Sequence, residues 1–186
     1  FIAHTGATLE ALGANATPRE TWANGEVSTT KAALAKAFPK DDIWGPAGVI
    51  AECRAVLPSD TIATVDSGAH RILLSQMWDT EHPHSLLQST GLCTMGCAVP
   101  LAIGAKLADP SRTVVSFSGD AGFLMVAGEM STAAEQGHNT VFVVFVDQSL
   151  ALIDLKQRQR QLSNKGVDFA GHDYAAIAKA FGGNGD

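Results

Sequence analysis

The sequence lacks several features that mark particular classes of protein. Its three cysteines, Cys53, Cys93 and Cys97, are too few and odd in number to build a disulfide framework, which favours a reducing, cytoplasmic compartment. No apolar run approaches the roughly 20 residues of a membrane-spanning helix, and no signal-peptide pattern opens the chain. Lys and Arg form no basic stripe, and the formal net charge is −6. We therefore expect no nucleic acid and no membrane as a partner.

Two common phosphate-binding signatures are also missing. The sequence contains neither G-x-x-x-x-G-K-[ST] nor G-x-G-x-x-G, so it predicts neither a P-loop nor a dinucleotide fingerprint. What the sequence does have is a hydrophobic content of 46% and a charged content of 17% over 186 residues. These values are typical of a soluble globular protein with one domain and some appended chain.

The composition changes along the chain. Residues 1–44 are rich in Ala, Thr, Asn and Gly, and only 29–38 has a helical pattern, so we expect the tail of a preceding region and a linker. Residues 45–186 are expected to form the main domain. The first residue, Phe1, and the closing "FGGNGD" suggest a fragment of a longer polypeptide.

Strand-like and helix-like segments alternate in the main domain. The patterns predict helices at 45–58, 69–78, 95–110, 122–137 (with Gly137 as its C-terminal cap), 150–161 and 173–183. They predict strands at 61–68, 85–90, 112–120 and 139–148. The strand segments are continuously apolar, which is typical of a parallel sheet with helices on both faces. The expected fold class is therefore α/β.

Three aspartates, Asp66, Asp120 and Asp147, each follow a predicted strand. Ligands of parallel α/β sheets bind at the carboxyl ends of the strands. A right-handed crossover between neighbouring strands would bring Asp120 and Asp147 to the same edge.

Two carboxylates at one edge suit Mg²⁺, which takes one or two carboxylates together with phosphate oxygens and water. The turn "SGDAG" and the helix behind it offer backbone N–H groups to an anion. The pattern indicates a phosphate-bearing ligand tethered through Mg²⁺. The alternative is that Asp120 and Asp147 only cap the helices that follow them, and spacing alone does not choose between the two.

Three sequence blocks resemble one family. "GDAGFLMVAGEMSTA", followed by "VFVVFVDQ", resembles the thiamine diphosphate motif, in which Gly-Asp-Gly precedes Asn-Asn. "TGLCTMGCAVPLAIGAKLADP" resembles a segment of the acetolactate synthase group, and "VDSGAHRILLSQ" resembles that group's D-x-G-x-H segment. The blocks occur in the family's order and cover roughly residues 45–181. The main domain thus resembles the carboxy-terminal, diphosphate-binding domain of such an enzyme.

The resemblance implies a role for each matched residue. Mg²⁺ would be held by the side chains of Asp120 and Asp147 and by the backbone carbonyl of Ser149. Met95 would be an apolar wedge that bends the cofactor, and the Cys93 carbonyl would accept a hydrogen bond from its aminopyrimidine.

Six further positions are implied to surround the diphosphate. Gly119, Ala121 and Gly122 would crowd it, and its terminal phosphate would be approached by Gly68, Ala69 and His70.

Some positions depart from the family pattern. Ala121 replaces the last Gly of Gly-Asp-Gly, which would strain the backbone if that position needs a positive φ. Asp147 replaces an Asn and adds a negative charge beside the diphosphate. Lys156 stands where acetolactate synthases have a pocket Trp, so their acceptor pocket does not carry over.

The resemblance implies thiamine diphosphate and Mg²⁺ as cofactors, a 2-oxo acid as substrate and acetolactate synthase-like carboligation. A 2-oxo acid decarboxylase of the same family, or a non-catalytic member that serves subunit assembly, are the alternatives. A flavodoxin-like or nucleotide-binding domain would bind phosphate without using Met95. The family's activating Glu lies in a separate domain, usually of a partner subunit, so we expect a homodimer or homotetramer and an inactive isolated fragment.

Overall fold

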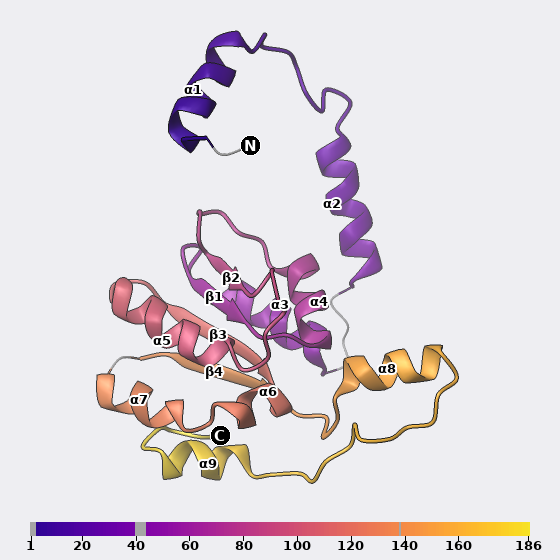
Figure 1. Ribbon diagram of the computed structural model, residues 1–186, viewed down its shortest axis with the longest axis vertical. Coiled ribbons are helices and arrows are strands. Elements are labelled where there is room, and N and C mark those ends of the chain that lie inside the picture. The colour runs from indigo at the N-terminus through magenta and orange to yellow at the C-terminus, as the bar shows by residue number, and fades with distance from the viewer. Residues whose placement is uncertain (1–2, 40–43, 138) are drawn as a thin grey trace. The chain divides into compact units, whose positions relative to one another are not determined.

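The computed structural model describes residues 3–39, 44–137 and 139–186 (Figure 1). The chain forms two units, Phe1–Ala37 and Phe38–Asp186. The expected boundary lies between residues 44 and 45, whereas the contacts within the structure divide the chain between 37 and 38. Residues 38–44 separate these two positions, and 40–43 among them lie outside the described residues.

The first unit contains two helices, α1 (Thr5–Asn15) and α2 (Glu26–Ala37), neither of which has a buried residue. Helix α2 includes most of the helical pattern expected at 29–38. The sequence does not predict α1, because its two glycines disfavour a helix. The helix nevertheless begins with a cap, since His4 Nδ1 accepts a hydrogen bond from the Ala7 N–H at 3.3 Å.

The second unit is built around four parallel strands: β1 (Ile62–Val65), β2 (Leu86–Gln88), β3 (Val114–Gly119) and β4 (Val141–Phe145). Their order in the sheet is β2-β1-β3-β4. This confirms the predicted parallel α/β fold. Because β3 and β4 are neighbours in both sequence and sheet, the residues that follow them meet at one edge of the sheet.

Seven helices accompany the sheet in the described part of this unit (Figure 1). They are α3 (Pro46–Val56), α4 (Ala69–Met77), α5 (Ala98–Ala108), α6 (Asp120–Met125), α7 (Glu129–Gln136), α8 (Ala151–Gln159) and α9 (Tyr174–Ala180). None of the described helices of the chain has the length and apolar character needed to cross a bilayer.

Alternate residues of the strands face the two helical layers, as the two-residue period of a strand requires. Ala63, Val65, Val115 and Phe117 pack with residues of α3 and α4. The intervening strand residues pack against α5, α6 and α7 on the opposite face. Burial on both faces explains why the strands read as continuous apolar runs.

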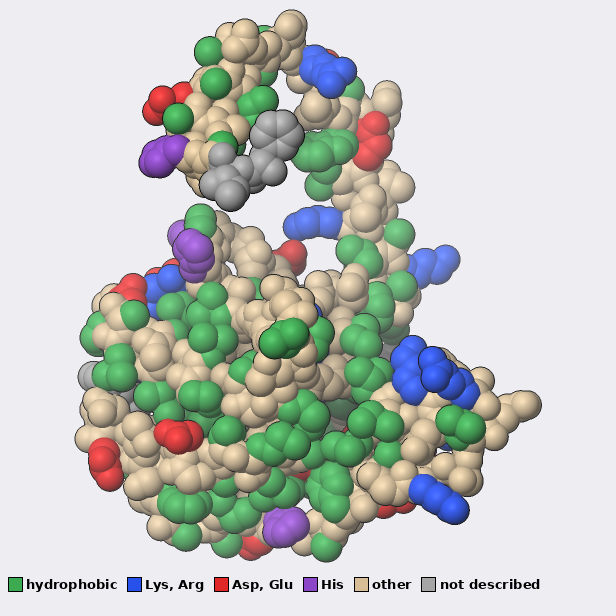
Figure 2. Space-filling view, in the orientation of Figure 1, with side chains coloured by type: hydrophobic (Ala, Val, Ile, Leu, Met, Phe, Trp, Pro, Cys, Tyr) green, Lys and Arg blue, Asp and Glu red, His purple; other side chains and the backbone are tan. Residues whose placement is uncertain are grey.

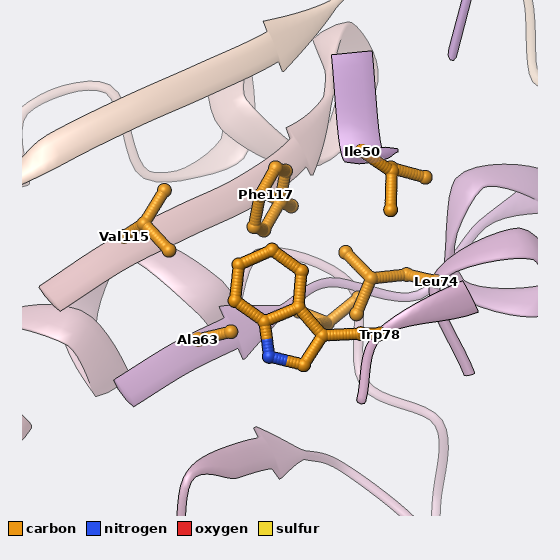
Figure 3. Packing of buried hydrophobic residues seen from close by; sticks show 7 residues of the cluster. Ile50, Ala63, Leu74, Trp78, Val115 and Phe117 are labelled. Carbon is orange, nitrogen blue, oxygen red and sulfur yellow. The ribbon is translucent and has the colours of Figure 1, made fainter. Parts of the chain in front are cut away.

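The core of the α3–α4 layer contains Trp78 packed against Phe117 (Figure 3). The two rings meet edge to face, with centroids 5.4 Å apart, an arrangement favoured by their quadrupoles. Ile50 and Leu74, both fully buried, lie on the helical side of this cluster. Together these contacts hold α3 and α4 against the sheet and so position the ends of β1 and β3.

Two predicted helices differ from the observed ones. The helix expected at 122–137 is divided into α6 and α7. Val126 leaves the helical backbone region (φ −133°, ψ 18°), and the Glu129 N–H donates to the Val126 carbonyl in a tight i→i+3 turn. The helix expected at 95–110 begins only at Ala98, since Gly96 has a left-handed φ of 75°. Gly137, with φ 65°, ends α7 as predicted.

Candidate functional site

A cavity of about 330 Å³ lies at the carboxyl ends of β1, β3 and β4. Every residue that the family resemblance assigned to cofactor or metal lines this one cavity. These residues are Gly68, Ala69, His70, Cys93, Met95, Gly119, Asp120, Ala121, Gly122, Asp147 and Ser149. Of these residues, the two furthest apart in the sequence, Gly68 and Ser149, are separated by 81 positions (149 − 68). Their roles toward a cofactor or metal stay predictions.

Asp120 connects the ends of β3 and β4. Its side chain is buried, at 2% exposure. Oδ1 accepts the Ala121 N–H at 2.8 Å, and Oδ2 accepts the N–H groups of Asp147 at 3.1 Å and Gln148 at 2.7 Å. Such charge-assisted bonds are about twice as strong as neutral ones. The carboxylate thus holds the exit of β4 beside the start of α6.

The capping alternative does not describe these two aspartates. The N-cap residues of α6 and α8 are Gly119 and Leu150, and neither makes a side-chain cap hydrogen bond. Asp147 Oδ1 instead accepts the Ser149 N–H, two residues on, at 3.2 Å. Both carboxylates line the cavity, where a ligand has access to them.

Asp147 is the more exposed of the two carboxylates. Partial removal from water raises the pKa of its carboxyl, the Ser149 N–H lowers it, and the Asp120 carboxylate raises it further. Two negative groups in mutual repulsion are stabilised by a cation placed between them.

The donor atoms at this point fit a hard cation. Two carboxylates and a backbone carbonyl are oxygen ligands, and Mg²⁺ completes such a set with phosphate oxygens and water. Among the described residues, no cluster of three or more His, Cys, Asp or Glu side chains forms a metal site. Two carboxylates and a carbonyl leave coordination positions that phosphate oxygens and water would fill.

His70 forms part of the cavity wall with an unsatisfied nitrogen. The side chain is 7% exposed, and its Nε2 has no hydrogen-bond partner. Burial lowers the pKa of the imidazole, while Asp66 and Asp120 oppose that shift. A Cβ added to Gly68 would lie 2.8 Å from the His70 ring. The missing side chain at position 68 leaves room for this ring, whose free nitrogen suits a polar ligand.

The backbone of Ala121, the residue after Asp120, is not strained. Ala121 lies inside α6 and is absent from the positive-φ positions of the described residues, so its methyl group costs the backbone nothing. Gly122 has no such freedom, because a Cβ there would overlap Asp66 Oδ2. Replacement of the last Gly of Gly-Asp-Gly therefore leaves the turn intact.

Cys93 and Met95 belong to an irregular segment, residues 89–97, between β2 and α5. Cys93 has a left-handed φ of 50°, and Arg71 Nη1 donates to its Sγ at 3.0 Å. Non-glycine residues rarely adopt a left-handed backbone, and those that do are concentrated at functional sites. Met95 is half-buried and lines the cavity between the Cys93 turn and α5.

The cavity also has an apolar wall, which the sequence did not predict. Leu73, Phe145 and the stretch 150–153 line it together with the predicted polar residues. The sequence signal that could have indicated this wall is the apolar run "LALI", which follows Ser149 directly at the end of the sheet that carries the cavity. These residues add an apolar part to the lining of a cavity that also contains carboxylates.

The basic segment "KQRQRQ" follows this wall on α8, and Figure 2 shows Lys and Arg side chains gathered over that helix. Lys156, Arg158 and Arg160 are exposed, and Arg158 pairs with Asp154 at 2.7 Å. Gln157 is half-buried and donates to the Lys165 carbonyl at 3.1 Å. The charged residues of this segment therefore face solvent.

Comparison with known proteins agrees with this geometry. An acetolactate synthase of Bacillus subtilis (strain 168) is 34% identical over 146 residues, which are 78% of this chain and 26% of that protein. A catabolic acetolactate synthase of Raoultella terrigena is 33% identical over 75% of this chain and 25% of its own length. The chain thus spans about a quarter of the relatives that it matches.

A solved structure has the same fold. The thiamine diphosphate-dependent 4-hydroxybenzoylformate decarboxylase of Rhodococcus jostii RHA1 superposes with a TM-score of 0.67 at 25% identity, over 74% of this chain and 26% of that one. Residues 66–186 match the family described as "Thiamine pyrophosphate enzyme, C-terminal TPP binding domain". The chain therefore belongs to the thiamine pyrophosphate enzymes and carries their C-terminal TPP-binding domain.

Proposed function

We propose that this chain is the cofactor-binding part of a thiamine diphosphate- and Mg²⁺-dependent enzyme that joins 2-oxo acids as acetolactate synthases do. The observation that carries the proposal is the single cavity lined by all the matched residues, with Asp120 bonded to the exits of both β3 and β4. Relatives named acetolactate synthase, at 33–34% identity, support this choice of reaction.

The residues of the chain would divide the work of holding the cofactor. Asp120, Asp147 and the Ser149 carbonyl would bind Mg²⁺, and His70 Nε2 would contact phosphate. Bound thiamine diphosphate would supply an electron sink for the carbon–carbon bond beside the 2-oxo group. Met95 would support the bent cofactor.

The apolar wall would exclude water from the reacting carbon. Leu73, Phe145 and residues 150–153 line the cavity and would offer no charge to the substrate. A dry wall strengthens the electrostatic interactions inside the site and protects a reactive carbon from protonation by solvent. The activating Glu would come from another domain of a partner subunit, so a homodimer or homotetramer in the cytoplasm is part of the proposal.

The direct test is calorimetric titration of thiamine diphosphate into the full-length protein, with and without Mg²⁺. Binding should need Mg²⁺ and should be lost in Asp120→Ala. Asp109→Asn is the matched control, because Asp109 follows α5 and is absent from the cavity lining. Absence of binding in the wild-type protein with Mg²⁺ would leave the non-catalytic role in subunit assembly, which the Asp147 substitution motivates.

The decarboxylase alternative is favoured by the solved relative, whose name is that of a 2-oxo acid decarboxylase. The two reactions share the cofactor and differ in the fate of the carbon that remains after CO₂ leaves. Product analysis of the full-length protein with pyruvate separates them. Acetolactate supports carboligation, and acetaldehyde alone supports decarboxylation. The isolated 186-residue fragment should give neither product.

A further inference from the structure

Asp66 is a buried carboxylate to which the proposed function gives no role. It follows β1 directly, is fully buried and is absent from the cavity lining. Its two oxygens accept three backbone N–H groups: Ser67 at 2.8 Å, Gly96 at 2.9 Å and Cys97 at 3.3 Å. The Cys97 thiol lies 3.6 Å from Oδ1 as a fourth, weaker donor. Most of this bonding therefore goes to a segment 30 residues further along the chain.

That segment is the one that carries Met95. Residues 89–97 contain no helix or strand, and Leu92 is 92% exposed, so backbone ladders do not order them. Gly96 has a left-handed φ of 75°, and a Cβ there would lie 3.1 Å from Val126. Met95 precedes this turn directly, so the position of the turn sets where the Met95 side chain enters the cavity.

Asp66 also fixes the distance to α6. A Cβ on Gly122 would overlap Asp66 Oδ2, and its nearest contact outside Asp66 would be the Gly96 N at 3.5 Å. The carboxylate is thus enclosed between the Gly96 turn and the helix that begins at Asp120. The three sequence blocks of the cavity meet at this one side chain.

A second contact holds the exposed end of the same segment. Arg71 donates Nη1–H to Cys93 Sγ and Nε–H to Gln88 Oε1, both at 3.0 Å. Arg71 and Asp66 both belong to the short stretch from the end of β1 to the first turn of α4. This stretch therefore forms hydrogen bonds to residues on both sides of Met95, namely Cys93, Gly96 and Cys97.

We propose that Asp66 is a positioning residue, which acts through residues 93–97 to hold Met95 in the cavity wall. Its effect on cofactor binding rests on the proposed function, whereas its effect on the order of residues 89–97 does not. An amide at position 66 keeps the size of the side chain but turns one acceptor into a donor, which then faces an N–H group. Asp66→Asn should therefore release the segment without emptying the core.

The first measurement is hydrogen exchange, followed by mass spectrometry, on the cofactor-free full-length protein. Asp66→Asn should speed exchange over residues 89–97 and leave β1 and β3 protected. Thr64→Val is the matched control, because Thr64 is equally buried and its hydroxyl donates to the Ala98 carbonyl at 2.8 Å. It removes a neighbouring bond from β1 to α5 but no bond to the Met95 turn. Equal exchange in the two variants would overturn the proposal.

The second measurement is a double-mutant cycle on thiamine diphosphate binding with Mg²⁺. Asp66→Asn should weaken binding roughly tenfold or more, Thr64→Val less than about twofold. In a Met95→Ala background, Asp66→Asn should have much less effect, because the group that it positions is gone. An undiminished effect of Asp66→Asn in that background would refute the action through Met95.

The two measurements separate the proposals. If the wild-type protein binds no thiamine diphosphate, the proposed function fails, and the exchange experiment still decides whether Asp66 orders the segment. If Asp66→Asn does not fold, Arg71→Gln frees the other end of the segment. Faster exchange over 89–95 with weaker binding is then expected, and no change in either would refute the positioning role.

Discussion

Two aspartates at neighbouring strand ends of this domain are built almost alike. Asp66 after β1 and Asp120 after β3 are both buried, and each accepts the N–H of the residue that follows it at 2.8 Å. Each also accepts two consecutive N–H groups from a distant segment. Asp120 borders the cavity, whereas Asp66 is covered by Gly122 and the Gly96 turn. The same bonding pattern thus leaves one carboxylate accessible from a cavity and encloses the other within the fold.

The largest difference should appear when each carboxylate is removed. Asp66→Ala should lower the free energy of unfolding by about 3 kcal/mol or more, because the carboxylate is fully buried and three backbone N–H groups lose their acceptor. Asp120→Ala should cost less, about 1–2 kcal/mol, because water in the cavity can replace the carboxylate. Urea unfolding of the cofactor-free full-length protein measures both. Equal losses would break the distinction between the two sites.

The cover over Asp66 is tested by adding one methyl group. Gly122→Ala should destabilise the protein by about 1–3 kcal/mol, because the new Cβ overlaps Asp66 Oδ2 and the segments around it must move. The control is Ala121→Gly on the same helix, which should cost about 0.5–1 kcal/mol through backbone entropy alone. Thermal unfolding of both variants measures these losses of stability. A Gly122→Ala variant as stable as the wild type would mean that Asp66 and α6 are not tightly packed at this position.

His70 lies beside both aspartates and should make stability depend on pH. Burial lowers the pKa of its imidazole below the unfolded value of about 6.5. The unfolded chain therefore binds the proton first, and the contribution of His70 to stability is present above pH 6.5 and is lost as the pH falls toward the folded pKa. His70→Gln should flatten the unfolding free energy between pH 7 and the folded pKa. An unchanged pH profile in that variant would contradict the assignment.

Replacement of Asp147 should have the smallest effect on stability, and the pKa shift behind it has the opposite sign to that of His70. The pKa of the Asp147 carboxyl is raised, so its charged form at neutral pH is unfavourable in the cofactor-free fold. Asp147→Asn should raise stability at pH 7 by no more than about 0.5 kcal/mol. That gain should vanish below the unfolded pKa of about 3.9, where the carboxyl is protonated in both states. A loss of stability at pH 7 would show that Asp147 has a cationic partner.

The sheet and the edge that carries the cavity could be predicted because their signals are local, whereas most of the cavity residues were assigned through the resemblance to a known family. Continuous apolar runs indicated buried parallel strands, and strands that end in Asp66, Asp120 and Asp147 indicated the functional edge of the sheet. The end of α7 at Gly137 was predicted for the same reason, since a left-handed cap favours Gly.

The remaining features depend on contacts between distant segments. The break between α6 and α7 comes from a tight turn at Val126, whose apolar side chain reads as part of a helix. The bond from Asp66 to Gly96 joins residues 30 apart, and no local pattern contains it. The left-handed backbone of Cys93 is likewise invisible in a sequence in which Gly is the usual sign of that conformation.

The junction between β3 and α6 has a consequence for how such chains can vary in length. The strand ends at Gly119 and the helix begins at Asp120, with no loop between them. One inserted residue would turn the whole of α6 by about 100° relative to the strand. Asp120 would then leave the exit of β4, and Gly122 would leave Asp66. Insertions and deletions should therefore be tolerated between α8 and α9, where 14 residues separate the helices (173 − 159), and be rejected at this junction.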